Sequence, residues 1–252
     1  MTRIPVKTAQ EIGLMRESSR IVAEVLTLVG GAVRPGMTTI ELDRMAEEYI
    51  RAQGGVPAFK GYGQGNRFPA TLCVSIDDEV VHGIPGPRRL EEGQVVSVDV
   101  GVKKNGYYGD AARTFAVGRV SEEKLRLLGV TEQSLDRAIA QVRPGNHLHD
   151  VSAAVQEHVE ANGFSVVRDL VGHGIGRLLH EEPSIPNFGA AGTGPLLKEG
   201  MVLAIEPMVN AGGYEVQLDH DGWTVRTRDG KPSAHFEHTV LVTQNDAEIL
   251  TR

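Results

Sequence analysis

The chain has 252 residues, enough to bury a sizeable hydrophobic core in one large domain or two small ones. Its formal net charge is −7 and its isoelectric point is near 5.7, which excludes a nucleic-acid-binding protein that depends on a broad basic surface. The single cysteine, Cys73, excludes an intramolecular disulfide and a metal site built from cysteines.

The N-terminal residues 1–20 lack the apolar centre of a signal peptide. No stretch of the chain reaches the roughly 18 apolar residues that a membrane span needs. We therefore expect a cytoplasmic protein that neither enters a membrane nor binds nucleic acid directly.

Two capping boxes predict the first two helices. The motif "TAQE" at 8–11 opens a long amphipathic helix that ends near "VRPG" at 33–36. The motif "TTIE" at 38–41 opens a second helix, which stops at Gly54-Gly55.

The next predicted element is a β-hairpin with its turn at Asn105-Gly106. In its first strand, alternation places Asp99 on one face with Val95 and Ser97, and the returning strand carries Asp110. Loops of two or of four residues both leave the two carboxylates on one face, with Cβ atoms roughly 5 to 8 Å apart. Taken alone, this pair of carboxylates could belong to an ordinary solvated surface or could share a cation.

The second half of the chain repeats this plan. A helix is predicted from Ser121, "VRPG" returns at 142–145, and a further helix runs from about Asp150 to Asn162-Gly163. Each half then carries a histidine flanked by glycine, within "VHGIP" in the first half and "GHGIG" in the second. The shared order of these motifs indicates an internal duplication.

The strands repeat as well. "EGQVVSVD" matches "EGMVLAIE" in register at an offset of 107 positions, which places Glu206 where Asp99 stands. In the strand "HFEHTVLV", Glu237 takes the place of Asp110, and Asp229-Gly230 predicts a hairpin turn before it.

These observations predict an α+β fold formed by a duplicated unit with a pseudo-two-fold axis. The antiparallel strands of both halves would form one central sheet that the helices cover on one side. We expect a single catalytic domain over 1–252, with internal halves at about 8–118 and 121–245. Four carboxylates would then surround the axis: Asp99, Asp110, Glu206 and Glu237.

Four gathered carboxylates would raise one another's pKa values unless cations neutralised them, and two divalent ions supply the matching charge. Carboxylate oxygens with one imidazole suit Mn, Fe(II), Co or Zn. A two-metal site activates water and polarises a carbonyl, so the predicted chemistry is hydrolysis. Among His82, His173 and His180, one could complete a metal's coordination while the others bind substrate or shuttle protons.

The ordered motifs "DDEVVHGIP", "VVSVDVG", "GDAART", "GHGIGRLLHEEP", "VLAIEPMV", "DGWTVRTRDG" and "AHFEHTVLVT" together resemble the type I methionine aminopeptidases of the pita-bread fold. The resemblance extends over about residues 4–250. It implies removal of the N-terminal methionine from nascent proteins and peptides whose second residue is small and uncharged. It also implies a monomer that meets its substrates at the ribosome.

The resemblance implies five ligands for two divalent ions: Asp99, Asp110, His173, Glu206 and Glu237. Asp110 and Glu237 would bridge both ions, and Asp99 would hold one ion. His173 and Glu206 would hold the other. In the family mechanism a bridging hydroxide attacks the carbonyl of the N-terminal methionine, and Glu206 handles its proton.

The resemblance further implies that His82 and His180 contact the scissile amide and the tetrahedral intermediate. The apolar pocket for the methionine side chain would be formed by Tyr62, Phe68, Cys73, Leu179 and Trp223, with Phe59 nearby. Two features depart from the family pattern. The segment 63–67 is a few residues longer than usual, and His235 replaces a residue that is usually a polar amide.

Two alternatives remain open. One is another pita-bread peptidase that acts on Xaa-Pro bonds, although such relatives normally carry an additional N-terminal domain. The other is a binding protein that kept the fold and lost the metals, although every ligand position is present.

Overall fold

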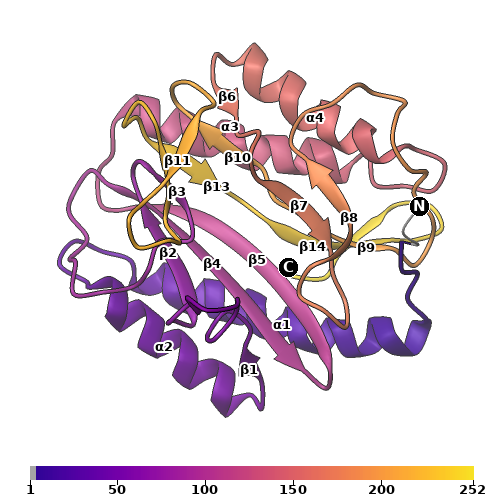
Figure 1. Ribbon diagram of the computed structural model, residues 1–252, viewed down its shortest axis with the longest axis horizontal. Helices are drawn as coiled ribbons and strands as arrows, with labels where there is room; N and C mark the ends of the chain where they lie inside the picture. Colours follow the sequence, from indigo (N-terminus) through magenta and orange to yellow (C-terminus); the bar gives the residue numbers. More distant parts are fainter. Residues whose placement is uncertain (1–3) are drawn as a thin grey trace.

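The computed structural model describes residues 4–252 (Figure 1). The helices are α1 (Ala9–Ala32), α2 (Thr39–Ala52), α3 (Glu122–Ile139) and α4 (Leu148–Ala161). The strands are β1 (Val56–Pro57), β2 (Leu72–Ile76), β3 (Glu79–Val81), β4 (Val95–Lys104), β5 (Tyr107–Ala116), β6 (Ser165–Val166), β7 (Val171–Gly174), β8 (Glu181–Pro186), β9 (Val202–Ile205), β10 (Met208–Asn210), β11 (Val216–Leu218), β12 (Val225–Thr227), β13 (Ser233–His235), β14 (His238–Val242) and β15 (Ala247–Ile249).

Side-chain caps set the helix starts. Thr8 and Thr38 each form a capping box with the glutamate three residues later, and Ser121 caps α3, as the sequence predicts. The last helix, α4, begins two residues before the predicted Asp150, because His147 is its N-cap. The Asp150 carboxylate accepts the backbone N–H of His147 at 2.7 Å and so lies inside the first turn rather than before it.

The turn of the β4–β5 hairpin has two residues, the shorter of the two predicted loop lengths. Its register pairs Lys104 with Tyr107 around the turn, so Asp99 lies opposite Ala112 and Asp110, which pairs with Gly101, lies two pairs closer to the turn. Both acids belong to the same face. The opposite face carries alternate valines that are fully buried in a core formed with α1 and α2: Val96, Val98, Val100 and Val102.

The second half builds its own core in the same way. Helices α3 and α4 bury Leu127 and Val155 against strand residues such as Leu203 and Val240. In Figure 1, α1 and α2 lie along the lower edge of the view and α3 and α4 along the upper edge. Both α1 and α3 pack against the β5 face that points away from Asp110, so the helices cover one side of the strands, as the sequence predicts. The two helix pairs therefore stabilise separate cores, and the strands between them meet at the centre of the molecule.

The predicted central sheet is interrupted where the halves meet. A four-stranded sheet contains β1, β2, β4 and β5, and a five-stranded sheet has the order β15-β14-β9-β7-β8. They join through Ala112 and Glu237, because each backbone N–H donates to the other's carbonyl, at 3.4 and 2.9 Å. Pro207, between β9 and β10, has no N–H to continue a ladder.

Two three-stranded sheets complete the fold, in the orders β13-β10-β6 and β11-β12-β3. The hairpin predicted at Asp229-Gly230 is wrong. Its flanking strands do not pair with each other, because β12 pairs with β11 and β3 while β13 pairs with β10. The turn residue Gly230 is present, with φ of 72°, but it redirects the chain from one sheet to another.

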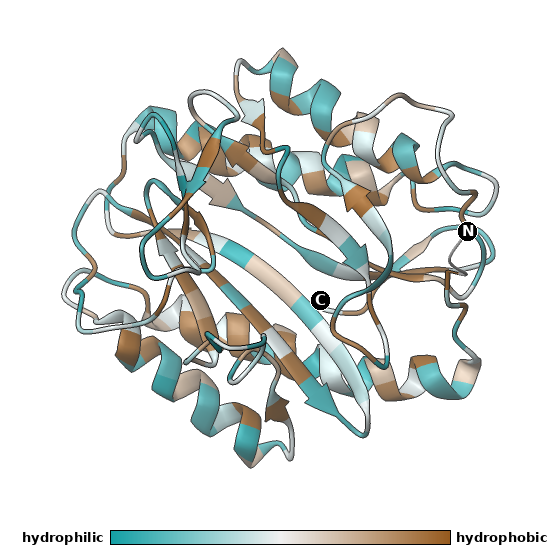
Figure 2. Ribbon diagram, in the orientation of Figure 1, coloured by the Kyte–Doolittle hydropathy of each residue, from teal (hydrophilic) through white to brown (hydrophobic). Residues whose placement is uncertain are grey.

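The distribution of hydropathy agrees with this layering. Figure 2 shows teal and brown segments alternating along the helices, as expected for helices with one buried face. None of the helices in the part of the chain that the structure describes has the length and apolarity that crossing a membrane requires.

Close packing of α1 on β5 generates a stability prediction. A Cβ added at Gly109 would lie 2.8 Å from the backbone nitrogen and Cα of Ser19, so Gly109→Ala forces the helix away from the strand. We expect a loss of about 1–3 kcal/mol in the free energy of unfolding, measured by urea denaturation.

The matched control is Gly13→Ala. Gly13 lies inside α1 with no atom within 4 Å of the added Cβ. The same change should there stabilise the protein by about 0.5–1 kcal/mol through helix propensity. Equal effects of the two variants would contradict the proposed close contact.

Candidate active site

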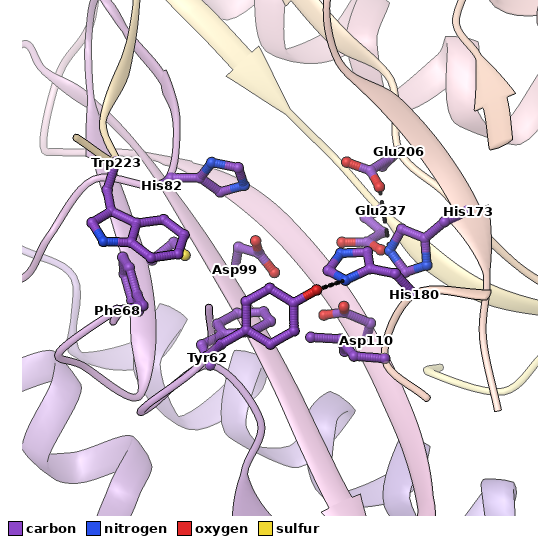
Figure 3. Close-up of a pocket in the computed structure, with 13 residues that line it drawn as sticks. Tyr62, Phe68, His82, Asp99, Asp110, His173, His180, Glu206, Trp223 and Glu237 are labelled. Atoms are coloured by element: carbon purple, nitrogen blue, oxygen red, sulfur yellow. Dashed lines mark hydrogen bonds and ion pairs between the residues drawn. The ribbon is translucent and has the colours of Figure 1, made fainter. Parts of the chain in front are cut away.

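One cavity of about 120 Å³ lies where the two halves meet (Figure 3). Every residue that the sequence analysis assigned to metal binding, catalysis or the methionine pocket contributes to its wall. The lining residues are Phe59, Tyr62, Phe68, Cys73, His82, Asp99, Asp110, His173, Leu179, His180, Glu206, Trp223 and Glu237.

Strands of both halves position the acidic end of the cavity. Asp99 lies on β4 and Asp110 on β5, and His173 lies on β7. Glu206 and Glu237 instead occupy the short interruptions between β9 and β10 and between β13 and β14. Interrupted ladders at these two positions let the carboxylates turn into the cavity while the flanking strands stay paired.

Burial dominates the electrostatics of these carboxylates. Burial raises the pKa of Asp110 to about 7. The pKa values of Asp99 and Glu206 are raised well above their usual range by burial first and then by the charge of Asp110. Burial, followed by the charges of Asp110, Glu206 and Asp99, does the same for Glu237. Such a cluster is unfavourable without a compensating positive charge.

Several carboxylate oxygens lack protein partners. Within residues 4–252, one buried oxygen of each of Asp99, Asp110 and Glu237 accepts no hydrogen bond. Buried polar atoms are normally paired, so these oxygens require an explanation. A bound cation supplies one, because it would coordinate the free lone pairs and offset the charge.

His173 completes a set of atoms with metal-ligand spacing. Ligand atoms of Asp110, His173 and Glu237 all lie within 4.8 Å of one another, and His173 Nε2 is 3.6 Å from Glu206 Oε1. Burial lowers the pKa of His173 to about 4, so its imidazole is neutral, as coordination requires. Its Nδ1–H donates to the carbonyl of Gly174 at 2.9 Å, which leaves Nε2 free. The residues therefore fit divalent metal ions.

His82 and His180 approach the cavity from opposite halves. His82 follows β3 with φ of 60°, a conformation that a side chain other than glycine rarely adopts. Burial lowers its pKa to about 4, so its ring is neutral near pH 7. The ring of His180 lies 4.3 Å from that of His173, and its Nδ1 is 2.7 Å from the Tyr62 hydroxyl. Both histidines can therefore present a nitrogen to a group bound beside the carboxylates.

The contact between the Tyr62 hydroxyl and His180 is one that sequence reasoning missed. The sequence predicts Tyr62 only as a wall of the methionine pocket, whereas the structure also joins it to His180. These residues are 118 positions apart, so no local motif could report their contact. Figure 3 shows the tyrosine ring at the cavity mouth, pointing toward His180.

The other end of the cavity is apolar. Phe68 packs edge-on against Trp223 with ring centroids 5.3 Å apart, and Leu179 is buried beside them. Cys73 pairs with Asp99 across the β2–β4 ladder. Burial raises the pKa of its thiol well above the usual range, and the Asp99 charge adds to this effect. The thiol is therefore neutral, and this end suits an uncharged, apolar side chain.

The two departures from the family pattern lie next to the cavity. In the 63–67 segment, the Asn66 amide donates to the carbonyl of Asp221 at 3.0 Å, and this ties the segment to the turn that carries Trp223. His235 is only 1% exposed, and its Nε2 lies 3.7 Å from Glu206 Oε2. Neither of its ring nitrogens has a hydrogen-bond partner within the described residues.

Comparisons with known proteins extend over the whole site. A model of metallopeptidase family M24 matches residues 13–244. A methionine aminopeptidase of Clostridium perfringens is 55% identical over 98% of both chains, and methionine aminopeptidase 1 of Bacillus subtilis is 51% identical over 98% of both. The crystal structure of the methionine aminopeptidase of Thermotoga maritima has a TM-score of 0.97 at 47% identity, over 99% of this chain and 100% of that one.

More distant structures share the fold alone. The prolidase of Pyrococcus furiosus is 24% identical with a TM-score of 0.79, and the alignment covers 98% of this chain but 65% of that protein. This chain therefore shares with the prolidases the fold of the aligned part.

The raised carboxylate pKa values predict how metal binding depends on pH. In chelator-treated protein, Asp110 with a pKa of about 7 binds more protons when folded than when unfolded, where its pKa is near 3.8. Stability should therefore fall as pH rises from about 4 to 7. Added Mn²⁺ should displace these protons and bind more tightly as pH rises over the same range.

Urea denaturation of chelator-treated protein at pH 5.5 and 7.5 tests the first part. Titration calorimetry with Mn²⁺ in two buffers of different ionisation enthalpy tests the second, because proton release makes the apparent heats differ. Identical heats in both buffers, with no pH dependence of stability, would contradict the buried carboxylate cluster.

Proposed function

The chain belongs to metallopeptidase family M24, and we propose that the acidic end of its cavity holds two divalent metal ions. The protein is a hydrolase that removes the N-terminal methionine from polypeptides, the activity for which full-length relatives at 45 to 55% identity are named. The observation that carries the proposal for the site is the convergence of all five predicted ligands on one cavity.

We assign the coordination as follows. All five residues would hold the ions: Asp110 and Glu237 would be shared by both, Asp99 would serve one ion, and His173 with Glu206 would serve the other. The unpartnered oxygens of the carboxylates and the neutral imidazole support this assignment. When bound, a pair of such ions lowers the pKa of water and polarises a carbonyl. The donor set suits Co, Mn, Fe(II) or Zn.

The chain's own residues orient the reaction. The Tyr62 hydroxyl donates a hydrogen bond to His180 Nδ1, so the ring proton of His180 lies on Nε2. This Nε2–H can donate to the carbonyl oxygen of the substrate. His82 faces the same position from the other half and contacts the scissile amide. Glu206 accepts the proton of the attacking water and passes it to the departing amine.

The apolar end of the cavity selects the side chain. Phe68, Trp223 and Leu179 would pack around a flexible thioether, which makes favourable contacts with aromatic rings. A cavity of about 120 Å³ has room for one side chain. A small, uncharged second residue fits beside His180 and Tyr62 at the mouth.

The natural substrates would be nascent polypeptides. Contact with the ribosome and a monomeric state stay predictions from the family resemblance, and a cytoplasmic location stays a prediction from the sequence. An Xaa-Pro activity is less well supported, because the prolidases share the fold at 20 to 24% identity, whereas the methionine aminopeptidases are 45 to 55% identical.

Three peptides separate the candidate activities. With Mn²⁺, Fe²⁺ or Co²⁺ restored after chelation, Met-Ala-Ser should lose its methionine, and Met-Lys-Ser and Ala-Pro should stay intact. Liberated amino acids can be measured by chromatography. Cleavage of Ala-Pro alone would replace the methionine assignment with an Xaa-Pro activity, and inactivity with every metal would favour a binding protein.

Two variants separate metal binding from substrate contact. His82→Ala should lower kcat on Met-Ala-Ser roughly 10²–10⁴-fold with normal metal content, because it removes a contact to the reacting amide. Asp110→Asn should instead lose bound metal, measured by atomic emission after desalting, while its circular dichroism stays unchanged. Metal loss in His82→Ala, or full activity of Asp110→Asn at limiting metal, would contradict the assigned roles.

A further inference from the structure

The loop of residues 175–181, between β7 and the first residue of β8, carries both Leu179 and His180 into the cavity. We call it the histidine loop. Its entry is held by β-sheet neighbours: Ile175 N–H donates to the carbonyl of Val202 at 3.1 Å, and the carbonyl of Gly176 accepts Tyr108 N–H at 2.9 Å. The end of the loop, by contrast, is held by the side chain of Glu181.

The carboxylate of Glu181 organises the exit. Its Oε1 accepts the backbone N–H groups of Arg177 and Leu178, at 2.7 and 3.1 Å, so the carboxylate closes the turn that carries His180. Its Oε2 accepts a hydrogen bond from the ammonium of Lys7. The side chains of Lys7 and Glu181 are 6% and 9% exposed, so this ion pair is buried.

Lys7 belongs to an N-terminal arm, residues 4–8, that leads into α1. Its backbone N–H donates to the carbonyl of Gly200 at 2.7 Å, in the turn that precedes β9. Its side chain fills the space beside Gly176, where a Cβ would meet Lys7 Cε and Nζ. The arm therefore connects the first helix of one half to a loop of the other half.

We propose that Lys7 is a positioning residue for His180, and that it acts through Glu181. Without the ammonium, the Glu181 carboxylate would be buried with no compensating charge, which is strongly unfavourable. It would turn to solvent and release the N–H groups of Arg177 and Leu178, and the turn that presents His180 would loosen. This inference rests on the proposed contact between His180 and the substrate.

A second tie to the same loop is weaker. Arg177 donates from Nη2 to Glu11 Oε1 at 3.2 Å, but its side chain is 69% exposed. Exposed ion pairs contribute little, because water competes with them. The buried pair is therefore the contact that fixes the loop.

The test compares Lys7→Met with Arg16→Met. Methionine keeps most of the volume of the lysine stem and removes the charge. Arg16 is the matched control, because it lies on α1 and its ion pair with Glu248 is exposed, at 51% and 39%. Three quantities are measured on the Mn²⁺-loaded enzyme: kcat and KM for Met-Ala-Ser, bound metal per chain, and hydrogen exchange over 175–181.

Lys7→Met should lower kcat roughly 10-fold to 100-fold, the effect of displacing a catalytic group by about 1 Å, with a smaller change in KM and unchanged metal content. Exchange should accelerate at the amides of Arg177 and Leu178 and stay normal in α3. Lys7→Arg, which restores the charge, should recover most of the lost kcat. Arg16→Met should behave as the wild type in every measurement.

A Lys7→Met enzyme with wild-type kcat would overturn the proposal. Activity lost together with bound metal, or with faster exchange throughout the protein, would also overturn it, because the effect would then be a general loss of structure. If Lys7→Met does not fold, Gly176→Ala serves instead, since its added Cβ would meet Lys7 Cε and Nζ as well as Glu181 Oε1, disturb the ion pair and give the same local effect.

The exchange measurement separates this proposal from the proposed function. A wild-type enzyme that cleaves no methionyl peptide would refute the function. Faster exchange at Arg177 and Leu178 in Lys7→Met would still support the ion-pair contact, and unchanged exchange would refute it.

Discussion

Mutual repulsion between buried carboxylates is the constraint on which the rest of this structure depends. Asp99 and Asp110 face one cavity together with Glu206 and Glu237. Burial raises the pKa of Asp110, and burial together with the charge of Asp110 raises the pKa values of the other three. Such a cluster would separate if its supports were soft. The supports are instead paired strands, because Asp99 and Asp110 lie within them and Glu206 and Glu237 lie directly between them, and each half buries the opposite strand face against two helices. Rigid packing outside the cavity is therefore what permits an unfavourable charge distribution inside it.

Duplication alone does not produce the site, because the two halves deliver their acids differently. The first half presents both carboxylates from an unbroken hairpin. The second half presents Glu206 and Glu237 from interruptions in its strands, one of which is followed by Pro207. The backbone bonds between Ala112 and Glu237 join the halves at this point. An axis that relates two similar units thus holds a site whose two sides are not equivalent, and two metal ions bound there would have different surroundings.

Local signals account for most of what the sequence predicts. Capping boxes, a two-residue turn and alternating valines act over a few residues, so the helices and the β4–β5 hairpin follow from them. The hairpin expected at Asp229-Gly230 fails because its strands find better partners in other sheets. Resemblance to known enzymes supplied the pocket residues, since no pattern within the chain marks Leu179 or Trp223. Contacts such as Tyr62 with His180 join distant segments and are visible only in three dimensions.

The arm that carries Lys7 has a consequence for the order in which the protein forms. It is synthesised well before its partners, Glu181 and Gly200, which lie in the other half of the chain. During synthesis α1 can pack on its own hairpin while the arm has nothing to bind. The histidine loop therefore reaches its final conformation only after both halves have been synthesised, and the catalytic centre of a growing molecule is incomplete until then.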